Sequence, residues 1–354
     1  MNNFHESLFE VNLNHLEKNL SFLKRNLNSN TKIISVVKAF AYGHGDIAIC
    51  KKLEKLNIYA FWVADFEEGV ILRKNGIEKP IIVANTSPKS ISQIIKYNLD
   101  VVVYNFRMLD ALISKKEPIT IHLKFNCGMN RFGFSTNDIP KIKKDLNNTK
   151  IIIRSICSHL SCSRMPDKDN LTNNELKEFN NIASKFPKNI LAHVLNTSGV
   201  MRFPQHQYSA IRLGIGLYGI HDEEQLVQIG KLTTTISQVR TLNKDEIIGY
   251  GGRFQTTKKM KIGVVPFGYA DGLDRRLGNS NGSLFVNGEE CKILAEISMD
   301  SCVIDLTETL AREGDRVEIF GLNNNINSIC EKIDSIPYEF LSKINRRIKR
   351  VYIN

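Results

Sequence analysis

Short runs of branched apolar residues alternate with segments of helical apolar spacing between about residues 31 and 220. The runs lack polar alternation, which is typical of strands buried on both faces of a parallel sheet. Strand–helix alternation favours an α/β fold, and seven or eight repeats of it favour a (β/α)8 TIM barrel over an open sheet. Strands are expected at 33–37, 59–64, 80–84, 100–104, 119–125, 150–156, 190–195 and 211–219, with helices that include 45–56, 66–75, 88–97 and 171–186.

The pattern changes after about residue 229. Strand-like runs follow one another closely there, separated by turn signals such as Asn287-Gly288. The sequence therefore predicts a barrel domain over residues 1–229 and a mostly β domain over residues 230–354. Two short helices, 326–333 and 337–344, are expected near the end of the chain.

Composition restricts the functional classes only slightly. The 354 residues are 42% hydrophobic and 24% charged, which is ordinary for a globular protein. The seven cysteines are an odd number without a paired C-x-x-C motif, so we expect neither a disulfide framework nor a metal site. Such cysteine usage favours a cytoplasmic location. Neither a signal-peptide pattern nor a membrane-spanning apolar stretch is visible, so no membrane partner is expected.

The net charge of +11 raises the question of nucleic acid. The basic clusters are short, dispersed and not interleaved with aromatic residues, and no nucleic-acid motif accompanies them. We therefore expect no nucleic-acid partner, and the positive charge suits an anionic small ligand better. The clusters lie at 141–144, 258–261 and 346–350.

Lys38 is the first candidate for chemistry. It ends the apolar run 33–37 and is followed by a turn of mostly small residues, 39–45. The carboxyl ends of core strands are where α/β folds place ligand chemistry. Partial burial there lowers the pKa of an amine and makes it able to form a Schiff base. This segment alone leaves a solvated loop lysine as an equal alternative.

Nine stretches of the chain, in family order, resemble the alanine racemase family of pyridoxal-phosphate (PLP) enzymes of fold type III. The resemblance implies a barrel followed by a β domain, with about the first ten residues packed on the latter, and a homodimer that binds PLP. The stretches are VVKAFAYGHG (36–45), HLKFNCGMNRFGF (122–134), CSHLS (157–161), HVLNTSG (193–199), IRLGIGLYG (211–219), PFGYADGL (266–273), EISMD (296–300), GDRVEIFG (314–321) and IPYEFL (336–341).

The resemblance implies two catalytic groups. Lys38 would hold PLP as an aldimine and then act as one acid/base group, while Tyr269 of the partner chain would serve the opposite face of the α-carbon. His159 matches the histidine that hydrogen-bonds that tyrosine, and His193 matches a second histidine of the same network. A buried turn tyrosine and satisfied core histidines are the structural alternatives.

The cofactor contacts are likewise implied by resemblance. Arg212 matches the arginine that faces the pyridine nitrogen, and a guanidinium only donates hydrogen bonds, so that nitrogen would stay unprotonated. Tyr42, Thr197 and the amides of Gly214 and Ile215 match the phosphate cradle.

The substrate contacts complete the set of implied residues. Arg131 matches the arginine that holds the substrate carboxylate. Lys124 matches a lysine that is carbamylated in many members and orients that arginine. Met299 and Asp300 match residues of the other subunit at the substrate entrance.

Several positions depart from the family pattern. Asn126-Cys127 replaces the usual Asp-Thr beside Lys124, and Arg164 stands where an aspartate is common at the entrance. Arg346 replaces the tyrosine on the cofactor phosphate, where it would either contact phosphate or be a solvated charge. These changes put substrate selectivity and gating in doubt more than the reaction type.

The sequence thus predicts a cytoplasmic, homodimeric, metal-free racemase that interconverts L-alanine and D-alanine for peptidoglycan. A racemase of serine or of several amino acids is the closest alternative. A fold type III decarboxylase is less consistent with Arg212 and the segment 268–272. A non-catalytic PLP carrier is less consistent with residues 230–354, because single-barrel carriers lack this domain.

Overall fold

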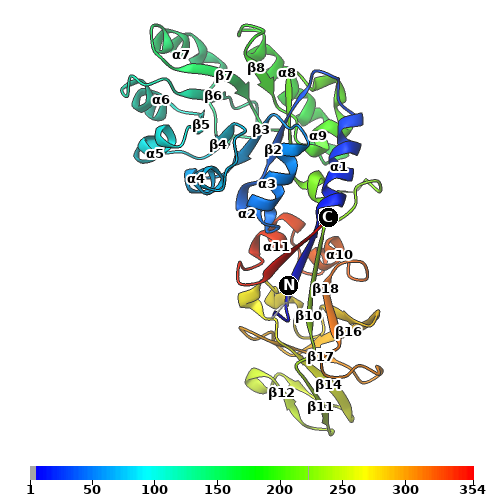
Figure 1. The fold of residues 1–354 in the computed structure, drawn as a ribbon. Coiled ribbons are helices and arrows are strands. Elements are labelled where there is room, and N and C mark those ends of the chain that lie inside the picture. The colour runs from blue at the N-terminus through cyan, green and yellow to red at the C-terminus, as the bar shows by residue number, and fades with distance from the viewer. Residues whose placement is uncertain (1–4, 222) are drawn as a thin grey trace.

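The structure, a computed structural model, describes residues 5–221 and 223–354, and a barrel lies above a β domain in Figure 1. The upper part is built on eight parallel strands in the order β8-β7-β6-β5-β4-β3-β2-β9. The amide of Arg212 donates to the carbonyl of Leu195 over 2.9 Å, which joins the two edges of the sheet. The predicted TIM barrel is confirmed. Its strands are β2 (Lys32–Val36), β3 (Ala60–Val63), β4 (Ile81–Val83), β5 (Asp100–Val103), β6 (Thr120–Lys124), β7 (Ile152–Cys157), β8 (Leu191–His193) and β9 (Ala210–Leu213).

Helices surround the barrel, and some of them begin at polar caps. Asp65 caps α4 by accepting from the amide of Glu67, and Asn105 caps α6 by accepting from the amide of Met108. Each predicted helix has a counterpart, with bounds that differ by at most three residues. The helices are α1 (Leu13–Arg25), α3 (Asp46–Lys55), α4 (Phe66–Lys74), α5 (Ile91–Lys96), α6 (Phe106–Ile113), α7 (Ile139–Leu146), α8 (Asp169–Ala183) and α9 (Thr197–Arg202).

The lower part contains a nine-stranded sheet in the order β11-β14-β17-β16-β15-β18-β10-β1-β19. Asn287 and Gly288, both at positive φ, form the turn between β15 and β16 that the Asn-Gly pair predicts. The mostly β character of this region is confirmed. Its strands are β1 (Leu8–Asn12), β10 (Gly230–Thr235), β11 (Gln238–Leu242), β14 (Met260–Val265), β15 (Ser283–Val286), β16 (Glu289–Leu294), β17 (Cys302–Asp305), β18 (Arg316–Phe320) and β19 (Lys349–Ile353), with a separate pair β12 (Ile247–Ile248) and β13 (Phe254–Gln255) and helices α10 (Ile326–Glu331) and α11 (Pro337–Lys343).

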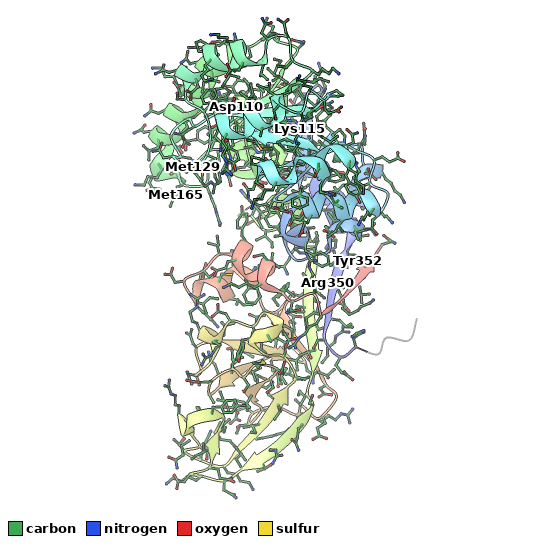
Figure 2. All side chains as sticks on the ribbon, turned by 90° about the vertical axis from the view of Figure 1, so that its left-hand side faces the viewer. Asp110, Lys115, Met129, Met165, Arg350 and Tyr352 are labelled. Carbon is green, nitrogen blue, oxygen red and sulfur yellow. The ribbon has the colours of Figure 1, made fainter. Side chains whose placement is uncertain are left out.

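Strands from both ends of the chain are neighbours in this sheet. β1 pairs antiparallel with β10 and parallel with β19. Figure 2 shows Arg350 and Tyr352 of β19 where the barrel and the β domain meet. Residues 1–4 of the segment expected to pack on the β domain lie outside the described residues.

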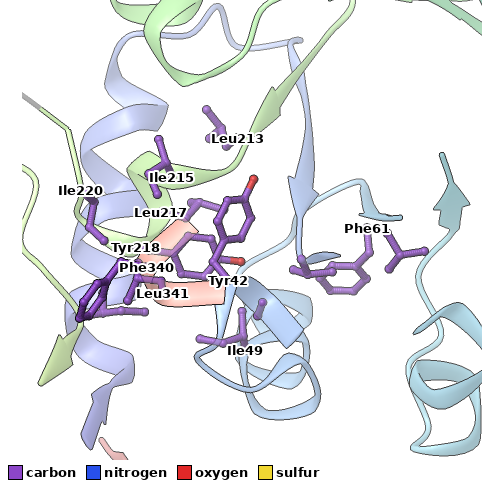
Figure 3. Close-up of a cluster of buried hydrophobic side chains, with 14 of the residues drawn as sticks. Tyr42, Ile49, Phe61, Leu213, Ile215, Leu217, Tyr218, Ile220, Phe340 and Leu341 are labelled. Atoms are coloured by element: carbon purple, nitrogen blue, oxygen red, sulfur yellow. The ribbon is translucent and has the colours of Figure 1, made fainter. Parts of the chain in front are cut away.

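A buried apolar cluster joins the two parts of the molecule (Figure 3). Tyr42 and Tyr218 of the barrel are in contact, with their tilted rings 4.8 Å apart between centroids, and Phe340 and Leu341 of α11 belong to the same core. A side chain at Gly43, where φ is +82°, would come within 2.2 Å of the carbonyl oxygen of Leu341. The glycine therefore allows α11 to pack directly against the turn that follows β2.

Candidate active site

A cavity of about 310 Å³ opens at the carboxyl ends of the barrel strands. Residues from many strand ends converge there, as is usual for this fold. The sequence-predicted residues that line it are Lys38, Tyr42, Lys124, Arg131, His159, Thr197, Arg212, Gly214 and Ile215.

The charge of the cavity has one sign. Lys38, Lys124, Arg131 and Arg212 line it, and its lining within the described residues contains no carboxylate. Clustered cations in a partly buried site attract anions strongly. The cavity therefore suits a ligand with more than one anionic group, such as a phosphate and a carboxylate.

Lys38 follows β2 and reaches the solvent inside this cavity. Burial is the main cause that lowers its pKa, and the positive charge of Arg131 lowers it further. Glu68 raises the pKa in opposition. The amine thus releases its proton more readily than a surface lysine, which suits a nucleophile.

The backbone after Lys38 forms a left-handed turn. Ala39, Phe40, Ala41 and Tyr42 have φ angles of 54°, 57°, 51° and 52°, and Gly43 continues at 82°. Consecutive non-glycine residues rarely adopt this conformation, because the Cβ atom crowds the following carbonyl. The surrounding contacts must therefore hold the turn in place.

Glu68 provides one of these contacts, and the sequence did not single it out. One carboxylate oxygen accepts from the amide of Ala39 and the other from the amide of Ala64, both over 2.7 Å. The single side chain thereby ties the Lys38 turn to the end of β3.

Arg212 lies at the base of the cavity, buried in β9. Its Nη2 donates to Nδ1 of His159 over 3.1 Å, and its Nη1 donates to Nδ1 of His193 over 2.5 Å. Further hydrogen bonds from these two nitrogens reach main-chain carbonyls of Ser158, His193 and Val194. Burial and the charge of Arg212 hold the pKa of both histidines well below the usual range, so both are neutral.

One wall of the cavity is made of hydroxyl groups and main-chain amides. Asn196 caps α9, and the Thr197 hydroxyl lies 3.4 Å from the amide of Gly214. A side chain at Gly214 would come within 2.7 Å of the Tyr42 hydroxyl oxygen. This wall fits the phosphate cradle expected from the sequence, because a small anion needs exposed amides and hydroxyl groups.

Lys124 ends β6 on the opposite side, with its Nζ 5.6 Å from the Phe132 ring centroid. Burial lowers its pKa, as does the charge of Arg212. In the next loop, Asn126 Oδ1 accepts from the amides of Gly128 and Asn130. Asn126, which differs from the family pattern, thus stabilises the loop to which it belongs.

Tyr269, Met299 and Asp300 form a second cluster, on the β domain. The amide of Tyr269 donates to the carbonyl of Ser298, and the amide of Ala270 donates to that of Met299. The three side chains are exposed. Among the described residues of this chain, none of the three lines the cavity.

The sequence did not predict several of the residues that line the cavity. Tyr338 of α11 lines the cavity, with its ring centroid 5.7 Å from that of Tyr42, and Trp62, Asn85 and Phe132 line it from the barrel. Arg346 instead places its guanidinium 4.7 Å from the Phe40 ring centroid and does not line the cavity. Burial raises the pKa of Tyr338, and the positive charge of Arg164 lowers it by a smaller amount.

No helix in the described parts of the chain has both the length and the apolar character that a membrane crossing requires. Within those same residues, histidine, cysteine and carboxylate side chains form no group of three that could hold a metal ion.

Comparison with known proteins gives one consistent result. Residues 11–222 match the family described as alanine racemase, N-terminal domain, and residues 229–352 match alanine racemase, C-terminal domain. "Alanine racemase 1" of Caldanaerobacter subterraneus subsp. tengcongensis is 33% identical over an alignment of 365 positions, which covers 97% of this chain and 94% of the relative.

Solved structures agree. An alanine racemase of Clostridium difficile 630 matches with a TM-score of 0.93 at 28% identity, over 98% of this chain and 96% of that one. A structure titled as alanine racemase from Bartonella henselae with covalently bound pyridoxal phosphate shares the fold, with a TM-score of 0.90 at 24% identity over 98% and 99% of the two chains.

The matched fold and domains define a barrel-type, pyridoxal-phosphate-dependent enzyme. More narrowly, the chain belongs to the alanine racemase family, whose members are isomerases.

Proposed function

We propose that this enzyme interconverts L-alanine and D-alanine, with PLP held in the barrel cavity. The convergence of Lys38, Arg131 and Arg212 in one cavity without a carboxylate carries the proposal. Bound PLP supplies an electron-withdrawing system that stabilises negative charge at the substrate α-carbon.

Arg212 would hold the ring nitrogen of the cofactor. Both of its terminal nitrogens already donate to histidines and carbonyls, whereas its Nε–H has no partner within the described residues. This N–H is the donor available to a ligand in the cavity. Because a guanidinium does not give up its proton, the ring nitrogen stays unprotonated, which limits charge delocalisation into the ring and disfavours side reactions.

The phosphate would bind the opposite wall. Tyr42, Thr197 and the amides of Gly214 and Ile215 offer hydroxyl and N–H donors there. The substrate carboxylate would bind Arg131, whose planar fork is suited to a two-point contact. These two anionic groups would offset the four cations of the cavity.

Two groups would move the proton of the α-carbon. Lys38 has the lowered pKa that a general base needs. Since Tyr269 is exposed on the β domain and absent from the cavity of its own chain, it would act in a second copy. His159 accepts from Arg212 through Nδ1 and so carries its own proton on Nε2, which leaves an N–H to orient the tyrosine oxygen.

Met299 and Asp300 lie beside Tyr269 and would border the same shared site. A homodimer with two sites follows from this arrangement. Supply of D-alanine for peptidoglycan in the cytoplasm is the proposed role, and the seven free cysteines agree with a reducing compartment.

The test is proton exchange in deuterium oxide. The purified protein with PLP is incubated with a panel of L-amino acids, and deuterium at the α-carbon is followed together with chirality. Exchange with inversion confined to alanine is the expected result, and Lys38→Ala is the inactive control. Inversion of serine or several amino acids would replace the proposal with a broader racemase, and release of carbon dioxide with a decarboxylase. Absence of exchange from every substrate would contradict racemisation altogether.

A further inference from the structure

A buried chain of hydrogen bonds runs from Arg212 through the barrel interior to Asp100. Arg212 Nη1 lies 2.5 Å from His193 Nδ1, and His193 Nε2 lies 3.0 Å from the Ser155 hydroxyl. That hydroxyl lies 2.6 Å from His122 Nδ1, and His122 Nε2 lies 3.1 Å from an Asp100 carboxylate oxygen. All five residues are buried.

With both histidines neutral, the two ends of the chain fix the direction of every bond. A guanidinium only donates, so His193 Nδ1 accepts and its proton resides on Nε2. His193 Nε2–H then donates to the Ser155 oxygen, and the Ser155 hydroxyl donates to His122 Nδ1. The remaining His122 proton resides on Nε2 and points at the Asp100 carboxylate, which accepts. Every donor meets an acceptor with both histidines neutral.

We propose that Asp100, His122 and Ser155 are positioning residues that hold His193 in the Nε2–H form and thereby fix the orientation of the Arg212 guanidinium. In the opposite tautomer, His193 would present an N–H to the N–H of Arg212, two donors in contact at the base of the cavity. The consequence for catalysis rests on the proposed function, whereas the tautomer itself does not.

The position of Arg212 makes this support necessary. The guanidinium is buried, and within the described residues its hydrogen bonds reach only imidazoles and main-chain carbonyls. Asp100 begins β5, at the end of the barrel away from the cavity. This chain of hydrogen bonds, here called the relay, therefore connects the Arg212 guanidinium of the active site to the Asp100 carboxylate at the far end of the barrel. Arg154 Nε lies 3.8 Å from the Asp100 oxygen that accepts from His122.

The test is the tautomer of His193 in the full-length protein, read from the ring nitrogen resonances of protein labelled with ¹⁵N-histidine. The wild type is expected to show neutral Nε2–H forms for both His193 and His122, with and without PLP. Ser155→Ala removes the hydroxyl between the two rings, so the His193 nitrogen shifts are expected to move toward a mixture of tautomers. With PLP and alanine, kcat is expected to fall about tenfold with little change in KM.

Ser35→Ala is the matched control. Ser35 is a buried serine in the barrel strand β2, and its hydroxyl has no hydrogen-bond partner in the described structure. The same change there should leave the histidine resonances and kcat near wild type. Asp100→Asn keeps the shape of the side chain but removes its charge. It should shift the His122 resonances more than the His193 resonances.

Two outcomes would overturn the relay. A wild-type His193 that carries its proton on Nδ1, or that is positively charged, contradicts the assigned direction. A His193 spectrum that is unchanged in Ser155→Ala, with kcat equal to that of Ser35→Ala, removes the positioning role. If the tautomers are as assigned but no amino acid is racemised, the relay stands and the proposed function fails.

Discussion

The Nε of Arg350 donates to the carbonyl oxygen of Gly43 over 2.9 Å, so the last strand of the chain holds the turn that carries Lys38. The other guanidinium nitrogens donate to carbonyls of Ile344, Asn345 and Ile348. The side chain is buried. A residue of the β domain thus supports the active site of the barrel.

Arg350→Lys tests that support. An ammonium group cannot satisfy carbonyls spread over the area of a guanidinium, and buried carbonyls left without donors cost about 1–3 kcal/mol each. The expected loss in the free energy of unfolding is about 2–3 kcal/mol, measured by denaturant unfolding of the cofactor-free protein. The control is Arg316→Lys in β18, where the guanidinium is half exposed and the expected cost is about 0.5 kcal/mol. Equal losses would contradict a special role for Arg350.

Lys38 is expected to form the covalent link to PLP. Lys38→Ala should abolish the visible absorbance band of the bound cofactor and its trapping by borohydride. Lys124→Ala should keep both, because Lys124 lies on the other side of the cavity beside Phe132. Mass spectrometry of the reduced peptide identifies the modified residue. A trapped adduct on Lys124 would contradict the assignment.

A shared active site predicts complementation between inactive chains. Tyr269→Ala should impair removal of the proton from L-alanine much more than from D-alanine, because the two bases face opposite sides of the α-carbon. Mixing Lys38→Ala and Tyr269→Ala chains should restore activity, since one site of a mixed dimer then contains both wild-type residues. Mixed dimers shown to form but lacking activity would refute a site built from two chains.

The left-handed turn predicts an unusual effect of glycine. Ala39 is exposed with φ at 54°, and left-handed backbone costs an alanine about 1–2 kcal/mol. Ala39→Gly relieves this strain but adds about 0.5–1 kcal/mol of chain entropy. A net gain of about 0.5–1 kcal/mol in the free energy of unfolding is expected. Ala48→Gly in α3 should instead cost about 1 kcal/mol. If Ala39→Gly and Ala48→Gly change the free energy of unfolding in the same direction, the turn is unstrained.

The buried side chain of His44 is expected to make the folded protein less stable in acid. Burial lowers its pKa to about 4, so the folded protein keeps this histidine neutral while the unfolded chain protonates it below about 6.5. The contribution of neutral His44 to the free energy of unfolding is complete above pH 6.5. It is lost as the pH falls toward 4, at up to about 1.4 kcal/mol per pH unit. In His44→Asn, unfolding measured across this range should show a shallower pH dependence. A slope equal to that of the wild type would exclude His44 as a source.

Most barrel strands could be predicted because they are short, largely apolar runs, as in the fully buried β3 and β4. The last one was predicted too long, since the strand expected at 211–219 ends at Leu213 and Ile215–Tyr218 forms a 3-10 helix. The residues at the carboxyl ends of the strands, such as Lys38 and Arg212, followed from the fold rule and the family resemblance. Tyr338 could not be predicted as a cavity residue, because its place depends on how α11 packs against the barrel. The left-handed turn was also hidden, since Ala39–Tyr42 contains none of the Gly or Asn residues that usually signal positive φ. His122 and Ser155 were hidden by their spacing, because only strand register brings them together.

The pairing of β1 with β10 and β19 has a consequence for synthesis on the ribosome. Asn12 ends β1, and Lys349 begins the strand beside it. At about 5–20 residues per second, roughly 20–70 s separate the emergence of these two segments. During that interval the edge of β1 lacks one neighbour, and its apolar residues Phe9 and Val11 lack their final cover. The first strand of the chain therefore gains its second neighbour in the sheet only when the last strand has been made.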